Sequence, residues 1–283
     1  MRVLLTNDDG VQAAGIDAIR AALTGICASV ITVAPGRDCS GFARKCTFSR
    51  PVNVRRLEGG QHPVYECDGT PTDCVRVGLL GGLAADAEVV VSGINHGANL
   101  SDDVVYSGTV GAGLEAAVLG TSSLCLSQQT PTGSFSVNYN EDLATQGLRY
   151  DFGLAARHGA QLAKAVARAR LGEPLVLSVN YPASAAATEA EAEPAMVLTR
   201  PGRRVYPRAS MRDWDKDPGT QSPYLFGEPN EVIPDADDAV NTDIAALRAG
   251  LISVTPLSIA VGLDKFSPAI TSFLTQLPIN LPS

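Results

Sequence analysis

Short apolar runs that end abruptly in polar residues recur along this chain. The first run, residues 2–5, leads directly into Asn-Asp-Asp-Gly at positions 7–10. An apolar run this short, closed by polar residues and a glycine, is typical of a strand buried in the centre of a parallel sheet. Ile16, Ile19 and Leu23 then fall on one face of a helical pattern. The chain therefore opens with a buried strand, a polar turn and an amphipathic helix.

The same order of strand and helix returns several times. Thr70, Pro71 and Asp73 form a capped helix start, which predicts a helix through Leu80. Residues 46–66 alternate loosely between apolar and polar, which predicts a hairpin that projects from the sheet. The whole pattern predicts a Rossmann-like, three-layer α/β/α fold with a mostly parallel sheet. The other expected strands are 28–34, 88–92, 123–127, 175–180 and 251–255, and the other expected helices are 112–119, 151–171 and 242–249.

The pattern changes after Pro182. An Ala/Glu-rich run of low complexity covers residues 184–193, and residues 200–238 are dense in Pro, Gly, Arg and Asp. This composition predicts an irregular excursion, which we place at residues 184–241 and expect to serve in oligomerisation. We therefore interpret residues 1–283 as a single α/β domain that contains this excursion.

Composition narrows the classes of function. The chain carries a net charge of −8 and has no long basic stripe, which argues against a nucleic-acid polymer as the main partner. The N-terminus lacks a signal-like apolar core and no segment reaches the length that spans a bilayer, so we expect a cytoplasmic protein with no membrane partner. The six cysteines form no Cys-x-x-Cys pair, and we interpret them as reduced thiols.

Asp8 and Asp9 stand side by side at the end of the first strand. In an open α/β sheet, ligands bind outside the carboxyl ends of the strands. Two adjacent carboxylates repel each other unless a cation or hydrogen-bond donors compensate, and oxygen ligands suit magnesium or manganese. The alternative is an ordinary turn or a helix N-cap, for which Asn and Asp are common residues. The sequence leaves both interpretations open.

Other polar loops open at the ends of later expected strands. Ser40 follows the second strand, and Asn95, His96 and Asn99 follow the strand at 88–92, where amides and glycines are dense. These side chains are expected to face the same edge of the sheet as Asp8.

A turn of Ser107, Gly108 and Thr109 precedes the small-residue helix at 112–119. Backbone amides and hydroxyls at the positive end of a helix dipole form a natural phosphate cradle. Simple N-capping of the helix by Ser107 or Thr109 explains the same residues equally well.

Together these motifs resemble the SurE family, the stationary-phase survival proteins, which are metal-dependent 5′/3′-nucleotidases and phosphatases. The motifs lie in family order and span nearly the whole chain. They are Thr6-Asn-Asp-Asp-Gly10, Ala34-Pro35 with Ser40-Gly41, Gly69-Thr-Pro-Thr-Asp-Cys74, Ser92-Gly-Ile-Asn95 with Gly97 and Asn99, Tyr106-Ser-Gly-Thr109, and Thr242-Asp243 through Gly250 to Ser253-Val-Thr-Pro256.

The resemblance implies a SurE fold and a metal-dependent phosphatase acting on nucleoside 5′- and 3′-monophosphates. It implies one divalent ion per subunit, Mg²⁺ or Mn²⁺, and a homodimer or homotetramer that exchanges C-terminal segments. Asp8 and Asp9 would be the catalytic residues. The implied metal ligands are Asp8, Asp9, Ser40 and Asn95, and the implied phosphate ligands are Asn99, Ser107, Gly108 and Thr109.

The chain departs from the family pattern in three places. Cys39 stands where a basic residue is common, Phe42-Ala-Arg-Lys45 replaces a small polar continuation, and Leu225-Phe226 differs from the usual aromatic pair. The departures leave the implied metal ligands intact and bear on substrate preference.

Several alternatives stay open on the sequence. A nicotinamide-dependent dehydrogenase would need Gly-x-Gly-x-x-Gly after the first strand, which residues 7–15 lack. A receiver-like binding module would be far shorter. A phosphatase of a specialised pathway with a non-nucleotide substrate, or a module that binds nucleotide without turnover, would keep the same motifs. His96 is the histidine to follow, as a contact to the leaving group or the base.

Overall fold

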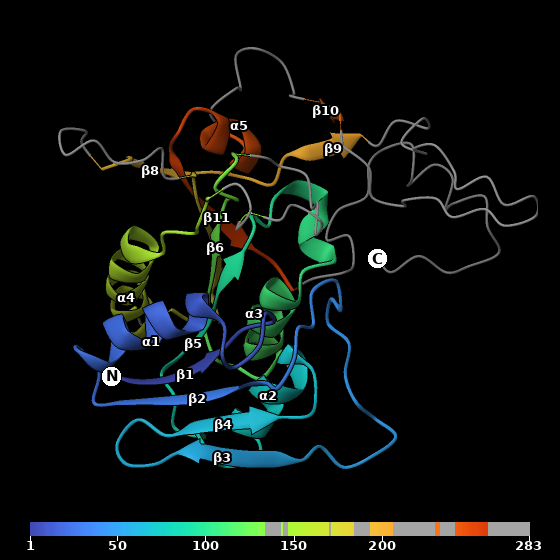
Figure 1. Ribbon diagram of the computed structural model, residues 1–283, viewed down its shortest axis with the longest axis vertical. Coiled ribbons are helices and arrows are strands. Elements are labelled where there is room, and N and C mark those ends of the chain that lie inside the picture. Colours follow the sequence, from blue (N-terminus) through green and yellow to red (C-terminus); the bar gives the residue numbers. More distant parts are fainter. Residues whose placement is uncertain are drawn as a thin grey trace, which may run out of the picture.

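A nine-stranded, mostly parallel sheet forms the centre of the molecule (Figure 1). The computed structural model describes residues 1–133, 143, 147–169, 171–183, 193–205, 230–232 and 241–259. Neighbouring strands in the sheet run parallel except at the β3–β4 and β7–β11 pairs. The strand order is β3-β4-β2-β1-β5-β6-β7-β11-β8. The strands are β1 (Arg2–Thr6), β2 (Ser29–Pro35), β3 (Val54–Glu58), β4 (Val64–Cys67), β5 (Val89–His96), β6 (Ser123–Gln128), β7 (Val176–Tyr181), β8 (Met196–Leu198) and β11 (Ile252–Leu257).

Helices cover both faces of this sheet, as the sequence pattern predicts (Figure 1). Helices α1 (Ala14–Thr24) and α4 (Gly153–Arg168) cover one face, and α2 (Pro71–Leu79) and α3 (Gly108–Val118) cover the other. A short 3-10 helix, η1 (Ser101–Val105), precedes α3, and α5 (Asp243–Arg248) precedes β11. The predicted three-layer α/β fold is confirmed.

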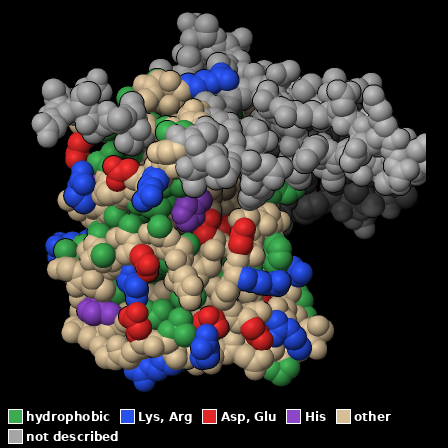
Figure 2. Space-filling view, in the orientation of Figure 1, with side chains coloured by type: hydrophobic (Ala, Val, Ile, Leu, Met, Phe, Trp, Pro, Cys, Tyr) green, Lys and Arg blue, Asp and Glu red, His purple; other side chains and the backbone are tan. Residues whose placement is uncertain are grey.

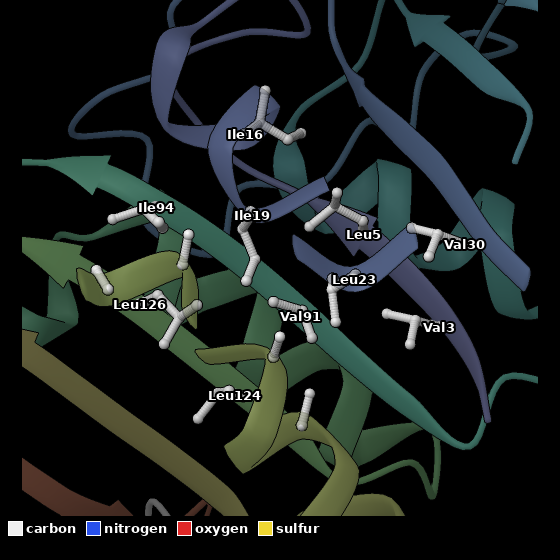
Figure 3. Close-up of a cluster of buried hydrophobic side chains, with 14 of the residues drawn as sticks. Val3, Leu5, Ile16, Ile19, Leu23, Val30, Val91, Ile94, Leu124 and Leu126 are labelled. Carbon is white, nitrogen blue, oxygen red and sulfur yellow. The ribbon is translucent and has the colours of Figure 1, made fainter. Parts of the chain in front are cut away.

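The alternation of side chains in β1 explains why both faces are apolar. Val3 and Leu5 are fully buried against α1 and α4, whereas Leu4 is fully buried in the cluster on the α2 and α3 side. Successive side chains of a strand point to opposite faces, so a central strand must be apolar at every position. Figure 3 shows Val3 and Leu5 together with Ile16, Ile19 and Leu23 of α1, the residues that the helical pattern singled out.

Most predicted elements occur within one to three residues of their expected bounds. The capping interpretation of Thr70 is confirmed, since its side chain accepts from the Asp73 amide and the Asp73 carboxylate accepts from the Thr70 amide. The predicted start of the helix at Ala112 was late, because Ser107 caps a helix that already begins at Gly108. This difference brings the Ser-Gly-Thr turn into the first turn of α3.

The strand expected at 88–92 was too short. Strand β5 continues through Asn95 and His96, with a register shift against β6 between Ser92 and Asn95. Gly93 explains the difference between the predicted and the observed end of this strand. A glycine after an apolar run predicts a strand end, but Gly93 lies inside β5 with φ +125°. A side chain at Gly93 would lie 2.3 Å from the Leu126 carbonyl oxygen, so the irregular pairing requires glycine.

The predicted hairpin is present, but it is shorter and lies in the sheet. Strands β3 and β4 pair antiparallel, and β4 in turn pairs in parallel with β2. The hairpin therefore extends the sheet at its edge where the sequence pattern predicted a projection. Every residue of β3 is exposed, and its pairing with β4 is interrupted by a bulge between Arg56 and Glu58.

Parts of the expected excursion at 184–241 form strands. Strand β8 joins the main sheet beside β11, and β9 (Arg203–Val205) pairs antiparallel with β10 (Asn230–Val232). Most of the Ala/Glu-rich run, most of residues 200–238 and the departure at Leu225-Phe226 lie outside the described residues. The domain assignment and the role of this segment in oligomerisation stay predictions.

The surface agrees with the predicted absence of a basic stripe on the face that Figure 2 shows. Basic and acidic side chains are interspersed there over the described part of the chain (Figure 2). Among the described residues, the helices are all too short or too polar to cross a membrane.

Candidate functional site

The polar strand ends meet where the order of the sheet reverses. Strand β1 lies between β2 and β5, so the chain moves to one side of β1 first and to the other side later. The crevice outside such a switch point is where open α/β sheets bind ligands. Asp8 and Asp9 follow β1, Ser40 lies in the loop after β2, and Asn95 lies near the end of β5. Three neighbouring strands therefore deliver the four implied metal ligands to one edge.

Asp8 is the most buried of these four side chains, with 3% of its surface exposed. Its Oδ1 accepts a hydrogen bond from the Thr109 hydroxyl at the start of α3, and its backbone oxygen accepts the Cys39 amide at 2.7 Å. Burial, followed by the charge of Asp9, raises the pKa of the Asp8 carboxyl to about 7, against the smaller opposite effect of the Thr109 bonds. Asp8 thus connects β1, α3 and the loop after β2, and its negative charge is poorly compensated by protein groups alone.

Asp9 is held by His96 at two points. The His96 Nδ1 lies 2.9 Å from Oδ1 of Asp9, and the His96 backbone amide donates to Oδ2 at 3.3 Å. The imidazole ring also makes edge-to-face contacts with Tyr150 and Phe152, at centroid distances of 4.9 and 5.1 Å. Burial lowers the pKa of His96, but the hydrogen bond and charge of Asp9 outweigh it, so the pKa is raised overall. His96 therefore orients Asp9, and two aromatic rings orient His96.

Ser40 and Asn95 present oxygen atoms at the same edge. The Ser40 hydroxyl and amide both donate to Asp38 Oδ1, at 2.6 and 2.8 Å. The Asn95 side-chain amide donates to the Gly97 carbonyl at 2.8 Å. In both residues a side-chain N–H or O–H group already donates to a nearby residue, which leaves the side-chain oxygen as an acceptor or a metal ligand.

Asn99 is fixed by the ends of two further strands. Its backbone amide donates to Oδ1 of Asn180 at 2.8 Å, and its side-chain amide donates to the Ser127 hydroxyl at 2.9 Å. Asn180 completes the exchange by donating to the Asn99 carbonyl at 3.0 Å. The sequence analysis did not include Ser127 and Asn180 among the candidate residues. Each is the last residue of an expected strand, and ligands of open α/β sheets bind at the carboxyl ends of strands, so this signal could have indicated both.

The start of α3 packs directly on Asp8. Ser107 caps this helix, since its hydroxyl accepts the Val110 amide at 3.1 Å. A side chain at Gly108 would place its Cβ 2.8 Å from both Cβ and Oδ2 of Asp8. The first amides of a helix have no acceptor within the helix and attract anions. N-capping by Ser107 and an anion cradle are therefore compatible in this arrangement.

The donors at this edge suit a hard divalent cation. The two carboxylates, one amide oxygen and one hydroxyl are ligands that Mg²⁺ or Mn²⁺ accept. Over the described ranges, no group of three or more His, Cys, Asp or Glu residues lies close enough together to hold a metal ion. Cys39, which lies beside Ser40, is buried, and burial raises the pKa of its thiol to about 11.

These features define an α/β protein whose paired carboxylates stand at the switch point of a mostly parallel sheet. Within that class the chain belongs to the SurE family, because the family model "Survival protein SurE" matches residues 3–208. The family predicted from the motifs is confirmed.

Relatives and a solved structure match over nearly the full chain. The "5′-nucleotidase SurE" of Rubrobacter xylanophilus is 41% identical over 91% of this chain and 91% of its own length. The "5′-nucleotidase SurE" of Idiomarina loihiensis is 36% identical over 98% and 99%. The crystal structure of the SurE protein from Aquifex aeolicus superposes with a TM-score of 0.73 at 29% identity, covering 97% of this chain and all of that one.

Proposed function

We propose that this protein is a metal-dependent phosphatase that hydrolyses nucleoside 5′- and 3′-monophosphates to nucleoside and phosphate. The observation that carries the proposal is the buried Asp8 beside Asp9, in contact with the first turn of α3 through Thr109. This contact brings two carboxylates, which suit a cation, next to a helix start, which suits an anion, and so supports the proposal. The relatives named 5′-nucleotidase match from end to end, which supports the enzyme class and the nucleotide substrate.

Asp8, Asp9, Ser40 and Asn95 would hold one Mg²⁺ or Mn²⁺ per subunit. The donor types and the uncompensated charge of Asp8 support this assignment. When bound, such an ion neutralises the phosphoryl oxygens and polarises the phosphorus centre.

The chain's own groups then position the phosphate. The amides of Gly108 and Thr109, with the Ser107 turn, face an anion at the positive end of α3. The Thr109 hydroxyl is already bound to Asp8, so we assign its amide to the phosphate and its hydroxyl to the carboxylate. Asn99, held in place by Ser127 and Asn180, would bind a further phosphate oxygen.

Chelation tests the proposal directly. The purified protein should release phosphate from a general aryl phosphate and from nucleoside monophosphates when Mn²⁺ or Mg²⁺ is present. Activity should vanish with a chelator and return when excess metal is added, because the protein groups alone do not neutralise the phosphoryl oxygens. Undiminished hydrolysis in the chelated protein would refute metal dependence, whereas nucleotide binding without phosphate release would favour the non-catalytic module.

We further propose direct attack by water on phosphorus, with Asp8 or Asp9 moving the proton. Neighbouring carboxylates that both hold the metal ion are poor nucleophiles, and hydrogen bonds already engage Asp8 from Thr109 and Asp9 from His96. In ¹⁸O-labelled water, the label should appear in released phosphate and not in the enzyme. Mass spectrometry that finds ¹⁸O in the peptide of residues 2–20 after turnover would show a covalent aspartyl-phosphate instead.

The loop after β2 is the place where a non-nucleotide preference would arise. Phe42 has two cations against its ring, with Arg37 Cζ at 5.6 Å and Lys45 Nζ at 5.0 Å from the centroid. Phe42 and Lys45 belong to the stretch after Ser40 that departs from the family pattern, and Arg37 lies before Ser40 in the same loop. A panel of phosphate monoesters in the assay above separates a nucleotidase from a phosphatase of another pathway.

We also propose that the protein is cytoplasmic and forms a homodimer or homotetramer with exchanged C-terminal segments. The full-length match to the relatives and to the solved SurE structure supports this only through family membership.

A further inference from the structure

Glu115 is a buried carboxylate outside the proposed metal and phosphate ligands. It lies on α3, and its side chain is only 5% exposed. Arg44 Nη2 lies 2.8 Å from its Oε2, and Arg76 Nη1 lies 2.5 Å from its Oε1. A buried carboxylate is costly unless it is paired, and removal of a partner leaves an uncompensated charge. Loss of either arginine contact would therefore be energetically unfavourable.

The two arginines join different parts of the molecule to the same carboxylate. Arg76 lies on α2, which already packs on α3 through Cys74, Val75 and the alanines of that cluster. Arg44 belongs to the irregular loop between β2 and β3. Of the two ion pairs of Glu115, the one with Arg44 joins a segment without helix or strand structure to α3.

That loop carries Ser40, four residues before Arg44. Its first part is held to the end of β1, where the Cys39 amide donates to the Asp8 carbonyl. Its later part is held to the segment before α3, where the Ala43 amide donates to the Tyr106 carbonyl at 3.1 Å. Ser40 therefore lies between two anchored points, and the Arg44 ion pair sits next to the second of them.

The loop backbone packs closely against α3 at Gly111, where there is no room for a side chain. A side chain at Gly111 would place its Cβ 2.6 Å from the Ala43 carbonyl oxygen. Ala43 itself has φ +52°, a region that residues other than glycine visit at a cost. Neighbouring interactions must hold such a conformation in place, and the ion pair of the next residue, Arg44, is one of these.

We infer that Arg44 is a positioning residue, which acts through Glu115 to fix the loop that carries Ser40 against α3. The inference rests on the proposed function in so far as Ser40 is a metal ligand. Outer-shell contacts of this kind orient the ligands and are felt in metal affinity. Arg76 balances the second oxygen of Glu115 from α2 and gives a matched control.

The test compares Arg44→Met with Arg76→Met in the full-length protein. Mn²⁺ affinity is measured by titration calorimetry, and the thermal midpoint is measured on the metal-free protein. Arg44→Met should weaken Mn²⁺ binding by about tenfold and lower kcat more than it raises KM for an aryl phosphate. Arg76→Met should lower the thermal midpoint to a similar extent but keep the Mn²⁺ affinity within about twofold, because the loop stays anchored. Arg44→Lys, which keeps the charge, should recover part of the loss.

A second measurement is independent of metal and of activity. In the metal-free protein, hydrogen exchange of the Cys39 and Ala43 amides should be faster in Arg44→Met and unchanged in Arg76→Met, because only the first change frees the loop. Equal effects of the two variants, or unchanged exchange and metal affinity in Arg44→Met, would overturn the inference. A wild-type protein that neither binds Mn²⁺ nor releases phosphate would refute the proposed function, and the exchange data would still decide the role of Arg44.

Discussion

Asp8→Asn should abolish metal-dependent phosphate release and at the same time raise the thermal midpoint of the metal-free protein at pH 7 to 8. Activity is lost because a neutral amide neither balances a divalent ion nor accepts a proton. Stability is gained because the wild-type protein must bury a charged carboxylate beside Asp9 at that pH. A protein of this size gains about 2 to 4 °C per kcal/mol, so a rise of several degrees is expected.

The protonation of Asp8 determines how the stability of the metal-free protein changes with pH. In the unfolded chain Asp8 loses its proton near its ordinary pKa of 3.8, whereas in the folded protein it does so at about 7. Between these values the folded state binds more protons than the unfolded state, so metal-free stability falls as pH rises. Below pH 4 Asp8 is protonated in both states, so it causes no loss of stability there. The thermal midpoints of wild type and Asp8→Asn should therefore diverge as pH rises from about 4 to about 7.

Asp17→Asn is the matched control, because Asp17 is exposed on α1 and its carboxylate pairs with Arg20. It should keep activity and show no such divergence. Near wild-type activity in Asp8→Asn would remove Asp8 from the metal ligands. A thermal midpoint that falls at pH 8 would instead mean that the Thr109 hydrogen bond outweighs the buried charge.

Gly108→Ala is expected to lower kcat/KM by about a hundredfold, since displacements of about 1 Å in an active site have effects of that size. The new Cβ would lie 2.8 Å from the Asp8 side chain, closer than real Cβ contacts allow. Either α3 or Asp8 must shift, and the Thr109 bond to Asp8 shifts with it. Alanine favours helix more than glycine does, so a general loss of helix stability does not explain the effect.

The control for this substitution is Gly172→Ala, where a new Cβ meets no atom within 4 Å. Steady-state kinetics and far-UV circular dichroism on both variants separate a local shift from misfolding. Unchanged kinetics in Gly108→Ala would show that Asp8 is not held by the start of α3 in the working enzyme.

The first strand and its carboxylates were predictable because their signals are local. The apolar run Val3 to Leu5 indicates a strand buried on both sides, and Asp8 and Asp9 follow it after Thr6 and Asn7. The same logic placed Ser40 and Asn99 at strand ends, and the capping pattern placed the helix after Thr70. In each case a few neighbouring residues contain the whole signal.

The pairings between distant residues were not predictable. His96 holds Asp9 across 87 positions, and Thr109 holds Asp8 across 101. Gly93 gives the same local signal whether a strand ends there or bulges and continues, and only the neighbouring strand β6 decides between the two. The Glu115 ion pairs depend on the packing of a loop, and the periodicity of α3 does not reveal them.

The exposed strand β3 has a consequence for the behaviour of this protein at high concentration. A flat, uncharged strand at the border of a sheet invites other chains to pair with its free backbone groups and form aggregates. Here Arg55, Arg56 and Glu58 place charges along that border, and the bulge bends the strand away from a flat geometry. The charges and the bulge therefore disfavour the pairing of β3 with strands of other protein molecules, which would lead to aggregation.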